Sequence, residues 1–239
     1  MQNVLIRIQN VVKDFKGVRA LSGVSFDVPP TAIYGLIGPN GAGKTTLINV
    51  INGVYGADEG DIYFKGRNII NLRSYEIAQM GISRTFQIAR VFKRMTVMEN
   101  MLSPYVVIKK DRSHILDRAN ELLEFVGLWD KRDQYAIELS GGQQKLLEFA
   151  RALMPDPELL LMDEPFAGIH PELRRKLMDL IRRLNVEYKK TFLIVSHDMR
   201  SISELCQHVV VLNFGTKLAE GNTQEILKDE KVIEAYLGE

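Results

Sequence analysis

The sequence predicts an α/β fold, because short apolar segments alternate with helical segments along its second half. Three mostly apolar runs, each short enough for a buried strand, occupy residues 159–162, 191–195 and 209–212. Residues 173–184 and 199–206 lie between these runs and are expected to be helices. A helix between consecutive strands is the connection that parallel strands use. We therefore expect a parallel sheet with crossover helices.

Further strands are expected in the first part of the chain. Residues 4–8 and 24–28 alternate between apolar and polar side chains, which is the pattern of a half-buried strand. The pair Pro29–Pro30 ends the second segment. Residues 32–37 form a short apolar run before glycines, as expected of a buried strand, and residues 61–64 predict another strand.

From residue 96 to residue 152 the pattern is mostly helical. Apolar side chains three and four positions apart occur there, as in Ile115, Ala119, Leu122 and Leu123. The simplest organisation is a single domain over residues 1–239. Residues 1–87 and 151–239 would form its core, and approximately residues 88–150 a helical insertion.

Composition and charge exclude several classes of protein. Of 239 residues, 46% are hydrophobic and 26% charged, which excludes a disordered chain, a fibre and a disulfide scaffold. Lys and Arg number 31 and Asp and Glu 30, and this net charge of +1 gives no sign of a nucleic-acid partner. The single cysteine, Cys206, permits no intramolecular disulfide. No signal peptide is visible and no apolar run approaches the ~18 residues of a spanning helix, so we expect no membrane span.

One glycine-rich segment predicts a phosphate-binding loop. Residues 38–45 match G-x-x-x-x-G-K-T between the apolar strand at 32–37 and a helix expected at 45–52. The ATP-binding residues we expect are Gly38, Pro39, Asn40, Gly41, Ala42, Gly43, Lys44, Thr45 and Thr46. Backbone N–H groups and the helix N-terminus would face the phosphates, Lys44 would reach the β- and γ-phosphates, and Thr45 would hold Mg²⁺. A chance match is the alternative, and the flanking strand and helix argue against it.

Two acids follow the apolar run at 159–162. A strand that ends in an acid delivers its carboxylate to the edge of the sheet where ligands of α/β folds bind. Asp163 is expected to hold Mg²⁺ through water, and Glu164 to act as general base on the attacking water. Two solvated acids at a strand end would be the simpler interpretation, but the phosphate loop upstream argues for a site.

The segment Leu139-Ser140-Gly141-Gly142-Gln143 closely resembles the signature of ABC-type ATPases. The resemblance implies a P-loop NTPase (RecA-like) core, an N-terminal antiparallel β subdomain and an inserted α-helical subdomain. It also implies that Ser140, Gly141, Gly142 and Gln143 face the ATP held by a second ATPase subunit. Ser140 would in addition cap an ordinary helix, which is compatible with that role.

Other residues match further motifs of this family in the expected order. Phe15, with Val18 beside it, is similar to the aromatic residue that stacks on adenine. Gln87 is similar to the glutamine that contacts Mg²⁺, and His197 to the histidine that contacts the γ-phosphate. The resemblance therefore assigns catalysis to Glu164, His197, Lys44 and Gln87, and Mg²⁺ binding to Thr45, Gln87 and Asp163.

One position departs from the family pattern. After Glu164 and Pro165 the family usually has Ala-Gly-Leu-Asp, whereas this chain has Ala-Gly-Ile followed by His170. A histidine cannot supply the fixed carboxylate of an aspartate. We expect backbone contacts around Ala167 and Gly168 to take over the contacts between subunits.

The subfamily is indicated by three segments. Residues 81–87, 95–100 and 232–239 are similar to ATPases of branched-chain amino-acid importers. This resemblance implies transmembrane permease subunits, a solute-binding protein outside the cell and a peripheral position on the cytoplasmic face of the membrane. Residues 88–100, apolar and basic, are expected to dock on the permease, or to form a solvated loop with a helix cap at Thr96.

Three alternatives remain at the level of sequence. ATPases of lipopolysaccharide export share a similar C-terminal ending, so export of a lipid is the first. A soluble ABC-type ATPase acting on ribosomes or DNA is the second, although this chain lacks the second nucleotide domain or long coiled coil usual there. A nucleotide-binding regulator without turnover is disfavoured because Glu164 and His197 are both present.

Overall fold

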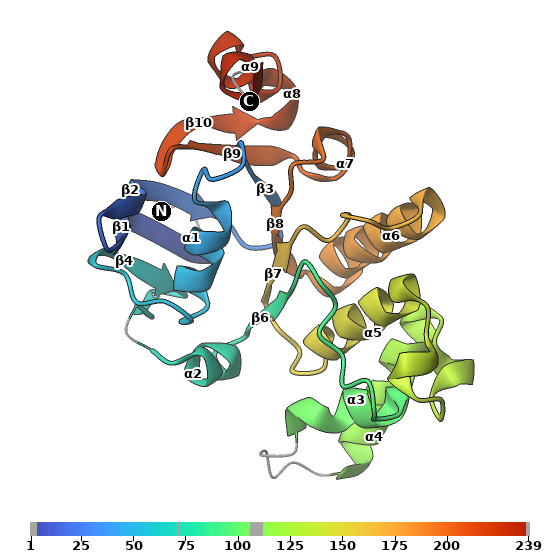
Figure 1. Ribbon diagram of the computed structural model, residues 1–239. Helices are drawn as coiled ribbons and strands as arrows, with labels where there is room; N and C mark the ends of the chain where they lie inside the picture. Colours follow the sequence, from blue (N-terminus) through green and yellow to red (C-terminus); the bar gives the residue numbers. More distant parts are fainter. Residues whose placement is uncertain (1–3, 71, 106–111, 238–239) are drawn as a thin grey trace.

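The central layer of the protein is a six-stranded sheet of order β10-β9-β3-β8-β7-β6 (Figure 1). The computed structural model describes residues 4–70, 72–105 and 112–237. The strands of this sheet are β3 (Ile33–Ile37), β6 (Ile82–Thr85), β7 (Leu159–Asp163), β8 (Thr191–Val195), β9 (His208–Asn213) and β10 (Thr216–Asn222). All neighbouring pairs are parallel except β9 and β10, which are antiparallel. The predicted parallel sheet is confirmed for the apolar runs.

Two strands of this sheet, β6 and β10, were not predicted from the sequence, and both lie at its edges. β6 consists of Ile-Ser-Arg-Thr, and β10 has no buried position. An edge strand has a neighbour on one side only, so it needs fewer apolar side chains than the strands between them. The periodicity of the sequence is weak there for that reason.

A second, antiparallel sheet of order β2-β1-β4-β5 is formed by the N-terminal part of the chain. Its strands are β1 (Ile6–Phe15), β2 (Val18–Val28), β4 (Glu59–Phe64) and β5 (Arg67–Asn68). The alternation predicted for residues 24–28 is confirmed, and β2 ends at the residue before Pro29. In the segment 4–8 the strand begins only at Ile6, and Leu5 before it is buried, so the alternation holds over residues 6–8.

Helices cover both faces of the central sheet. The helices of the described residues are α1 (Lys44–Ile51), α2 (Ser74–Gln79), α3 (Val97–Leu102), α4 (Arg112–Val126), α5 (Gly141–Leu153), α6 (Pro171–Tyr188), α7 (Met199–Leu205), α8 (Thr223–Ile226) and α9 (Glu230–Leu237). Single 3₁₀ turns occur at Ser103–Tyr105, Trp129–Lys131 and Ala136–Glu138. Among the residues that the structure describes, no helix combines the length and the apolar character needed to cross a bilayer.

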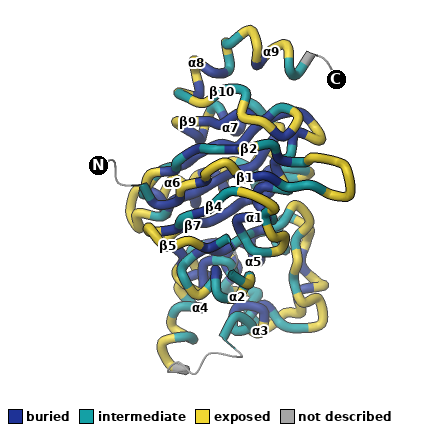
Figure 2. Tube along the Cα trace, turned by 90° about the vertical axis from the view of Figure 1, so that its left-hand side faces the viewer, coloured by how far each residue is buried: buried dark blue, intermediate teal, exposed yellow. Residues whose placement is uncertain are grey.

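The strands of the central sheet supply two separate cores, because successive side chains point to opposite faces. Leu36, Leu161 and Leu193 pack with α1 and the antiparallel sheet. Ile37 and Met162, one residue further along their strands, pack with α5 and α6 on the opposite face. Figure 1 shows α1 on one side of the sheet and α5 and α6 on the other, and Figure 2 shows the buried positions concentrated in the strands. The loops before α1 and before α5 are therefore separated by the sheet.

The helices α3, α4 and α5 lie in the region of the predicted helical insertion, at the lower right of Figure 1. The helix α5 continues to Leu153, three residues beyond the expected boundary at residue 150. The exact division of the chain stays a prediction. Of the C-terminal segment at 232–239 that indicated the subfamily, Gly238 and Glu239 lie outside the described residues.

Candidate functional site

The glycine-rich loop connects the buried strand β3 to α1, and two of its glycines are required by the fold itself. Gly38 has a φ of 147°, and a Cβ there would lie 2.1 Å from the carbonyl oxygen of Leu212. Gly43 has a φ of 98°, and a Cβ there would lie 2.5 Å from the carbonyl oxygen of Ala20. φ values of 147° and 98° lie outside the region that residues with a side chain adopt, and contacts this short leave no room for a Cβ. The loop is thus held against β9 and β2.

The ammonium group of Lys44 lies against its own loop. Its Nζ donates to the carbonyl oxygens of Gly38 at 2.6 Å and Pro39 at 2.7 Å, and the residue is 8% exposed. Asn40, Gly41 and Thr45 are exposed, so one side of the loop is open to solvent. The helix α1 begins at this loop without any side-chain cap, which leaves its N–H groups available for an anion.

The side chain of Asp163 lies beside this loop, as predicted. It is the last residue of β7 and is 4% exposed. Thr45 Oγ1 is 3.5 Å from Asp163 Oδ1, while Asp163 Oδ2 accepts a hydrogen bond from Arg84 Nη2 at 2.9 Å. These two predicted metal ligands are 118 positions apart in the sequence and meet at one edge of the sheet.

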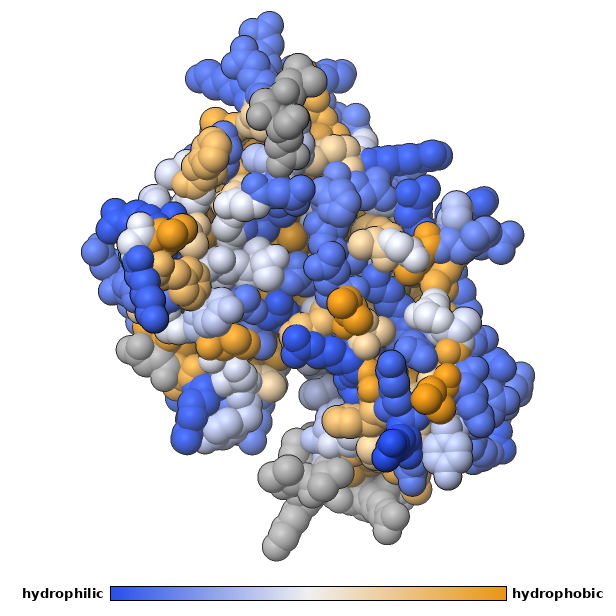
Figure 3. All heavy atoms as spheres, viewed as in Figure 1, coloured by the Kyte–Doolittle hydropathy of each residue, from blue (hydrophilic) through white to orange (hydrophobic). Residues whose placement is uncertain are grey.

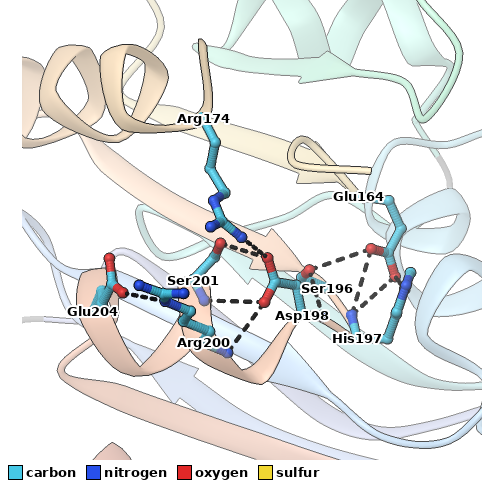
Figure 4. A network of polar contacts seen from close by, with 8 residues as sticks. All are labelled: Glu164, Arg174, Ser196, His197, Asp198, Arg200, Ser201 and Glu204. Carbon is cyan, nitrogen blue, oxygen red and sulfur yellow. Dashed lines mark hydrogen bonds and ion pairs between the residues drawn. The ribbon is translucent and has the colours of Figure 1, made fainter. Parts of the chain in front are cut away.

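The predicted general base, Glu164, is held by residues that follow β8 (Figure 4). Ser196 Oγ donates to Glu164 Oε2 at 3.2 Å, and the backbone N–H of His197 donates to Glu164 Oε1 at 3.1 Å. His197 Nδ1 lies 2.9 Å from the same Oε1. Glu164 has a φ of 48°, a left-handed conformation that non-glycine residues rarely adopt and that clusters at functional sites. The structure therefore brings Glu164 and His197 into direct contact.

The next residue after His197, Asp198, makes contacts that stabilise the fold. Its carboxylate accepts hydrogen bonds from the Arg200 and Ser201 backbone N–H groups, and so caps α7. It also accepts from Ser201 Oγ at 2.6 Å and Arg174 Nη1 at 3.0 Å (Figure 4). Burial opposes ionisation of Asp198, but the hydrogen bonds from Ser201 and Arg174 outweigh it and lower the pKa of its carboxyl group.

The predicted adenine platform is partly exposed at the end of the hairpin between β1 and β2. Phe15 is 39% exposed and Val18 is 70% exposed, and they pair across the turn. The ring of Tyr55 meets the Phe15 ring edge-on, with 5.2 Å between centroids. Tyr55 was not predicted to lie here, because nothing in the sequence links it to residue 15.

The signature residues begin α5, on the other face of the sheet from the phosphate loop (Figure 1). Ser140 Oγ accepts from the Gln143 N–H at 3.3 Å, and Gln143 Oε1 accepts from the Ser140 N–H at 3.0 Å. This capping box confirms the predicted helix cap. A Cβ on Gly141 would have no neighbour within 4 Å, whereas one on Gly142 would lie 2.4 Å from Leu173 Cδ2. The structure does not bring this segment to the phosphate loop of the same chain.

The helix α5 carries two charged side chains that sequence reasoning missed. Glu148 is buried, and its carboxylate accepts the Arg90 N–H at 2.9 Å. Burial raises the pKa of Glu148, against the hydrogen bonds from the Arg90 and Phe86 backbone. Lys145 Nζ donates to the carbonyl oxygen of Ala167 at 3.0 Å. The sequence does show a lysine and a glutamate three residues apart among apolar residues of the expected helix, and this pattern could have indicated that both side chains make buried contacts.

These contacts link α5 to the segment that contains Gln87 and to the segment that follows Glu164. Glu148 contacts the segment that contains Gln87, which is itself exposed just after β6. Lys145 contacts the segment after Glu164, where His170 replaces the usual aspartate. His170 caps α6 by accepting the Glu172 N–H at 3.4 Å, and its side chain is 74% exposed. The expected role of the Ala167–Gly168 backbone between subunits stays a prediction.

The oxygen donors at this site fit a divalent cation whose remaining ligands come from the nucleotide and water. The described residues contain no group of three His, Cys, Asp or Glu side chains able to hold a metal alone. A hydroxyl and one carboxylate are instead adjacent, at Thr45 and Asp163. Magnesium in nucleotide sites is usually held by one or two protein oxygens, with phosphates and water as the other ligands. The fold and this site together define a P-loop ATPase.

Comparison with known proteins narrows the class. The family model described as ABC transporter matches residues 21–167, and the model described as branched-chain amino acid ATP-binding cassette transporter matches residues 216–239. The chain belongs to the ABC transporter family of ATP-binding proteins. It is an ATPase cassette, and both the predicted fold class and the predicted family are confirmed.

Relatives and solved structures match over almost the whole chain. A probable branched-chain amino acid transport ATP-binding protein LivG of Archaeoglobus fulgidus is 42% identical, over 98% of this chain and 95% of the relative. The high-affinity branched-chain amino acid transport ATP-binding protein LivG of Salmonella typhimurium is 37% identical over the full length of both. The ADP conformation of MJ1267, an ATP-binding cassette of an ABC transporter, superposes with a TM-score of 0.90 at 38% identity, covering 99% of each chain.

Proposed function

We propose that this chain is the ATP-hydrolysing subunit of a transporter that imports branched-chain amino acids. The main support for hydrolysis is the arrangement of four residues at one edge of the sheet. Thr45 Oγ1 lies 3.5 Å from Asp163 Oδ1, and His197 Nδ1 lies 2.9 Å from Glu164 Oε1. The substrate class is supported by the relatives named LivG and by the C-terminal match over residues 216–239. None of the site residues would touch the transported molecule, so the substrate rests on those similarities.

The exposed side of the phosphate loop would receive ATP. Backbone N–H groups of residues 38–46 and the Lys44 ammonium would bind the β- and γ-phosphates. Phe15 would stack on adenine, with Val18 alongside. Thr45, Asp163 and Gln87 are the residues that would hold magnesium, which would supply positive charge beside the phosphates.

The pair Glu164–His197 would carry out hydrolysis. Glu164 would accept a proton from water as the water oxygen bonds to the γ-phosphorus and the bond to the β–γ bridging oxygen breaks, releasing ADP and phosphate. His197 holds Glu164 through Nδ1, and its exposed ring is free to contact the γ-phosphate. Ser196 fixes the second oxygen of Glu164, so that the base has one defined orientation.

The signature segment would bind ATP held by a second subunit. Gly141 has no positive φ, and a Cβ on this residue would have no neighbour within 4 Å, so the fold of this chain does not require glycine there. A glycine with open space around it leaves room for the close approach of an external group. The dimeric post-hydrolysis structure of the cassette MJ0796 bound to ADP and Pi, 26% identical with a TM-score of 0.81 over 91% of this chain and 98% of that one, supports a dimer.

The segment after Gln87 would dock on transmembrane permease subunits at the cytoplasmic face of the membrane, within the helical insertion at about residues 88–150. Ile88 is 82% exposed and Phe92 52% exposed. Figure 3 shows hydrophobic and hydrophilic side chains interleaved on this face, around α3 and α5. Thr96 and Glu99 also form the predicted capping box, which is compatible with docking. A solute-binding protein outside the cell would complete the importer.

Glu164→Gln tests hydrolysis. The variant should bind ATP as the wild type does, form a stable ATP-dependent dimer, and lose at least about 100-fold in turnover, the size of a general-base contribution. Glu187→Gln, at an exposed position on α6, is the matched control and should hydrolyse normally. Wild-type turnover in Glu164→Gln would remove the general-base assignment.

Leucine uptake tests the substrate class. Cells whose only copy is Glu164→Gln should lose high-affinity uptake of radiolabelled leucine, with expression and membrane association unchanged. Unchanged uptake would redirect the transporter to another solute or to lipid export, and would leave the ATPase assignment intact.

A further inference from the structure

Arg84 is a buried arginine that the proposed mechanism does not use. It lies in β6, the edge strand beside β7, and its side chain is 5% exposed. Nη1 donates to Asn49 Oδ1 of α1 at 2.5 Å, and Nη2 donates to Asp163 Oδ2 at 2.9 Å. The guanidinium also lies 4.7 Å from the centre of the Phe86 ring. One side chain therefore connects the helix of the phosphate loop, the acidic strand end and the segment leading to Gln87.

The contact with Arg84 makes the two oxygens of Asp163 different. Oδ2 is occupied by the guanidinium, whereas Oδ1 faces the hydroxyl of Thr45 at 3.5 Å. A half turn of the carboxylate would only exchange two equivalent oxygens, but any intermediate rotation would break the bond to Arg84 and turn the carboxylate plane away from Thr45. Because Arg84 is fixed from its other side by Asn49, it holds the carboxylate in one orientation.

Stability alone does not explain an arginine at this position. The side chain of Arg84 is 5% exposed, so its charge is largely removed from water, which costs free energy. Its Nε is buried without a hydrogen-bond partner among the described residues. Buried ion pairs of this kind are often no more stable than apolar side chains of similar volume. The free-energy cost of burying Arg84 is therefore better explained by a role in the nucleotide site than by a contribution to the stability of the core.

We propose that Arg84 is a positioning residue for the divalent cation: it holds Asp163 by Oδ2 so that Oδ1 is presented on the side of Thr45. The inference rests on the proposed function, in which Thr45 and Asp163 hold Mg²⁺. Arg84 touches neither nucleotide nor metal in this role, and its effect passes through Asp163.

The test measures metal affinity separately from nucleotide affinity. Mn²⁺ is titrated into the full-length protein saturated with ADP, and free Mn²⁺ is followed by electron paramagnetic resonance; ADP affinity is measured independently in EDTA. Arg84→Met should weaken Mn²⁺ binding at least tenfold and change ADP affinity in EDTA less than twofold. Arg84→Lys, which keeps the charge without the fork, should lie between Arg84→Met and wild type. Arg7→Met, which removes the exposed pair with Asp27, is the matched control.

Each result decides between roles. Equal or tighter Mn²⁺ binding in Arg84→Met would overturn the proposal, since it would show that Arg84 is neutral to the metal or repels it. A parallel loss of ADP and Mn²⁺ affinity would also overturn it, by showing a general structural role. If Arg84→Met does not fold, Asn49→Ala replaces it: weaker Mn²⁺ binding supports the proposal, and unchanged binding overturns it. Failure of the wild type to bind Mn²⁺ with ADP would contradict the proposed function instead.

Discussion

Two glycine-rich segments begin helices in this protein, and they are built by opposite means. At the start of α1, Gly38 and Gly43 have positive φ values and backbone oxygens within 2.6 Å of where a Cβ would lie, and no side chain caps the helix. At the start of α5, Ser140 and Gln143 cap the helix reciprocally, and Gly141 has open space. The fold requires glycine at Gly38 and Gly43 in the first segment, whereas at Gly141 in the second it leaves open space beside the backbone.

The strongest way to break this comparison is Gly38→Ala. A methyl group 2.1 Å from the Leu212 carbonyl oxygen, at a φ of 147°, should lower the free energy of unfolding by about 3 kcal/mol or more and abolish nucleotide binding. Urea denaturation and ADP titration measure both effects. Gly41→Ala, whose Cβ would have no neighbour within 4 Å, is the control for stability and should lower the free energy of unfolding by only about 1 kcal/mol.

Lys44→Ala should affect binding far more than folding. The variant loses two hydrogen bonds to loop carbonyls and a cation beside the expected phosphates, so we expect ADP affinity to fall about 100-fold, or about 2.7 kcal/mol. Fluorescent-nucleotide titration measures the affinity, and circular dichroism monitors the fold. Retained affinity would mean that the ammonium stays on its loop when nucleotide is bound.

Gly141→Ala sharpens the comparison at the second segment. Alanine is favoured over glycine in a helix, so the free energy of unfolding should stay level or rise by up to about 1 kcal/mol. In a Glu164→Gln background, the ATP-dependent dimer should nevertheless weaken at least tenfold, as measured by sedimentation. Gly56→Ala, at a similarly open glycine, is the control. A dimer of normal affinity would contradict the proposed contact with the partner's ATP.

A substitution at the start of a third helix, α7, should have the smallest effect of these variants. The pKa of Asp198 is lowered in the folded state, so Asp198 contributes stability above its ordinary pKa and loses it as the pH falls through the folded pKa. Asp198→Asn keeps a helix cap but cannot ionise, and should cost about 1 kcal/mol at neutral pH. Urea denaturation between pH 7 and about pH 3 should show a shallower acid dependence in the variant than in the wild type. An unchanged acid dependence would mean that Asp198 contributes no pH-dependent stability.

Features made of neighbouring residues could be predicted from the sequence, whereas contacts between distant residues could not. The phosphate loop was predictable because its residues are contiguous and flanked by a strand and a helix with clear periodicity. Arg84 was not, because its importance depends on Asp163, 79 positions away, and on Asn49 in another element. Tyr55 beside Phe15 and Lys145 beside Ala167 were missed for the same reason.

The sequence by itself determined the family, the apolar strands and the order of the motifs, since each depends on neighbouring residues and on the periods of helix and strand. Only the tertiary structure decided which side chains meet. Parallel strands bring Asp163, Glu164 and His197 to one edge, and the same sheet keeps Ser140 on the opposite face from Lys44. The physical reason is that contacts between distant segments are set by strand order and packing, which leave no periodic signal in the chain.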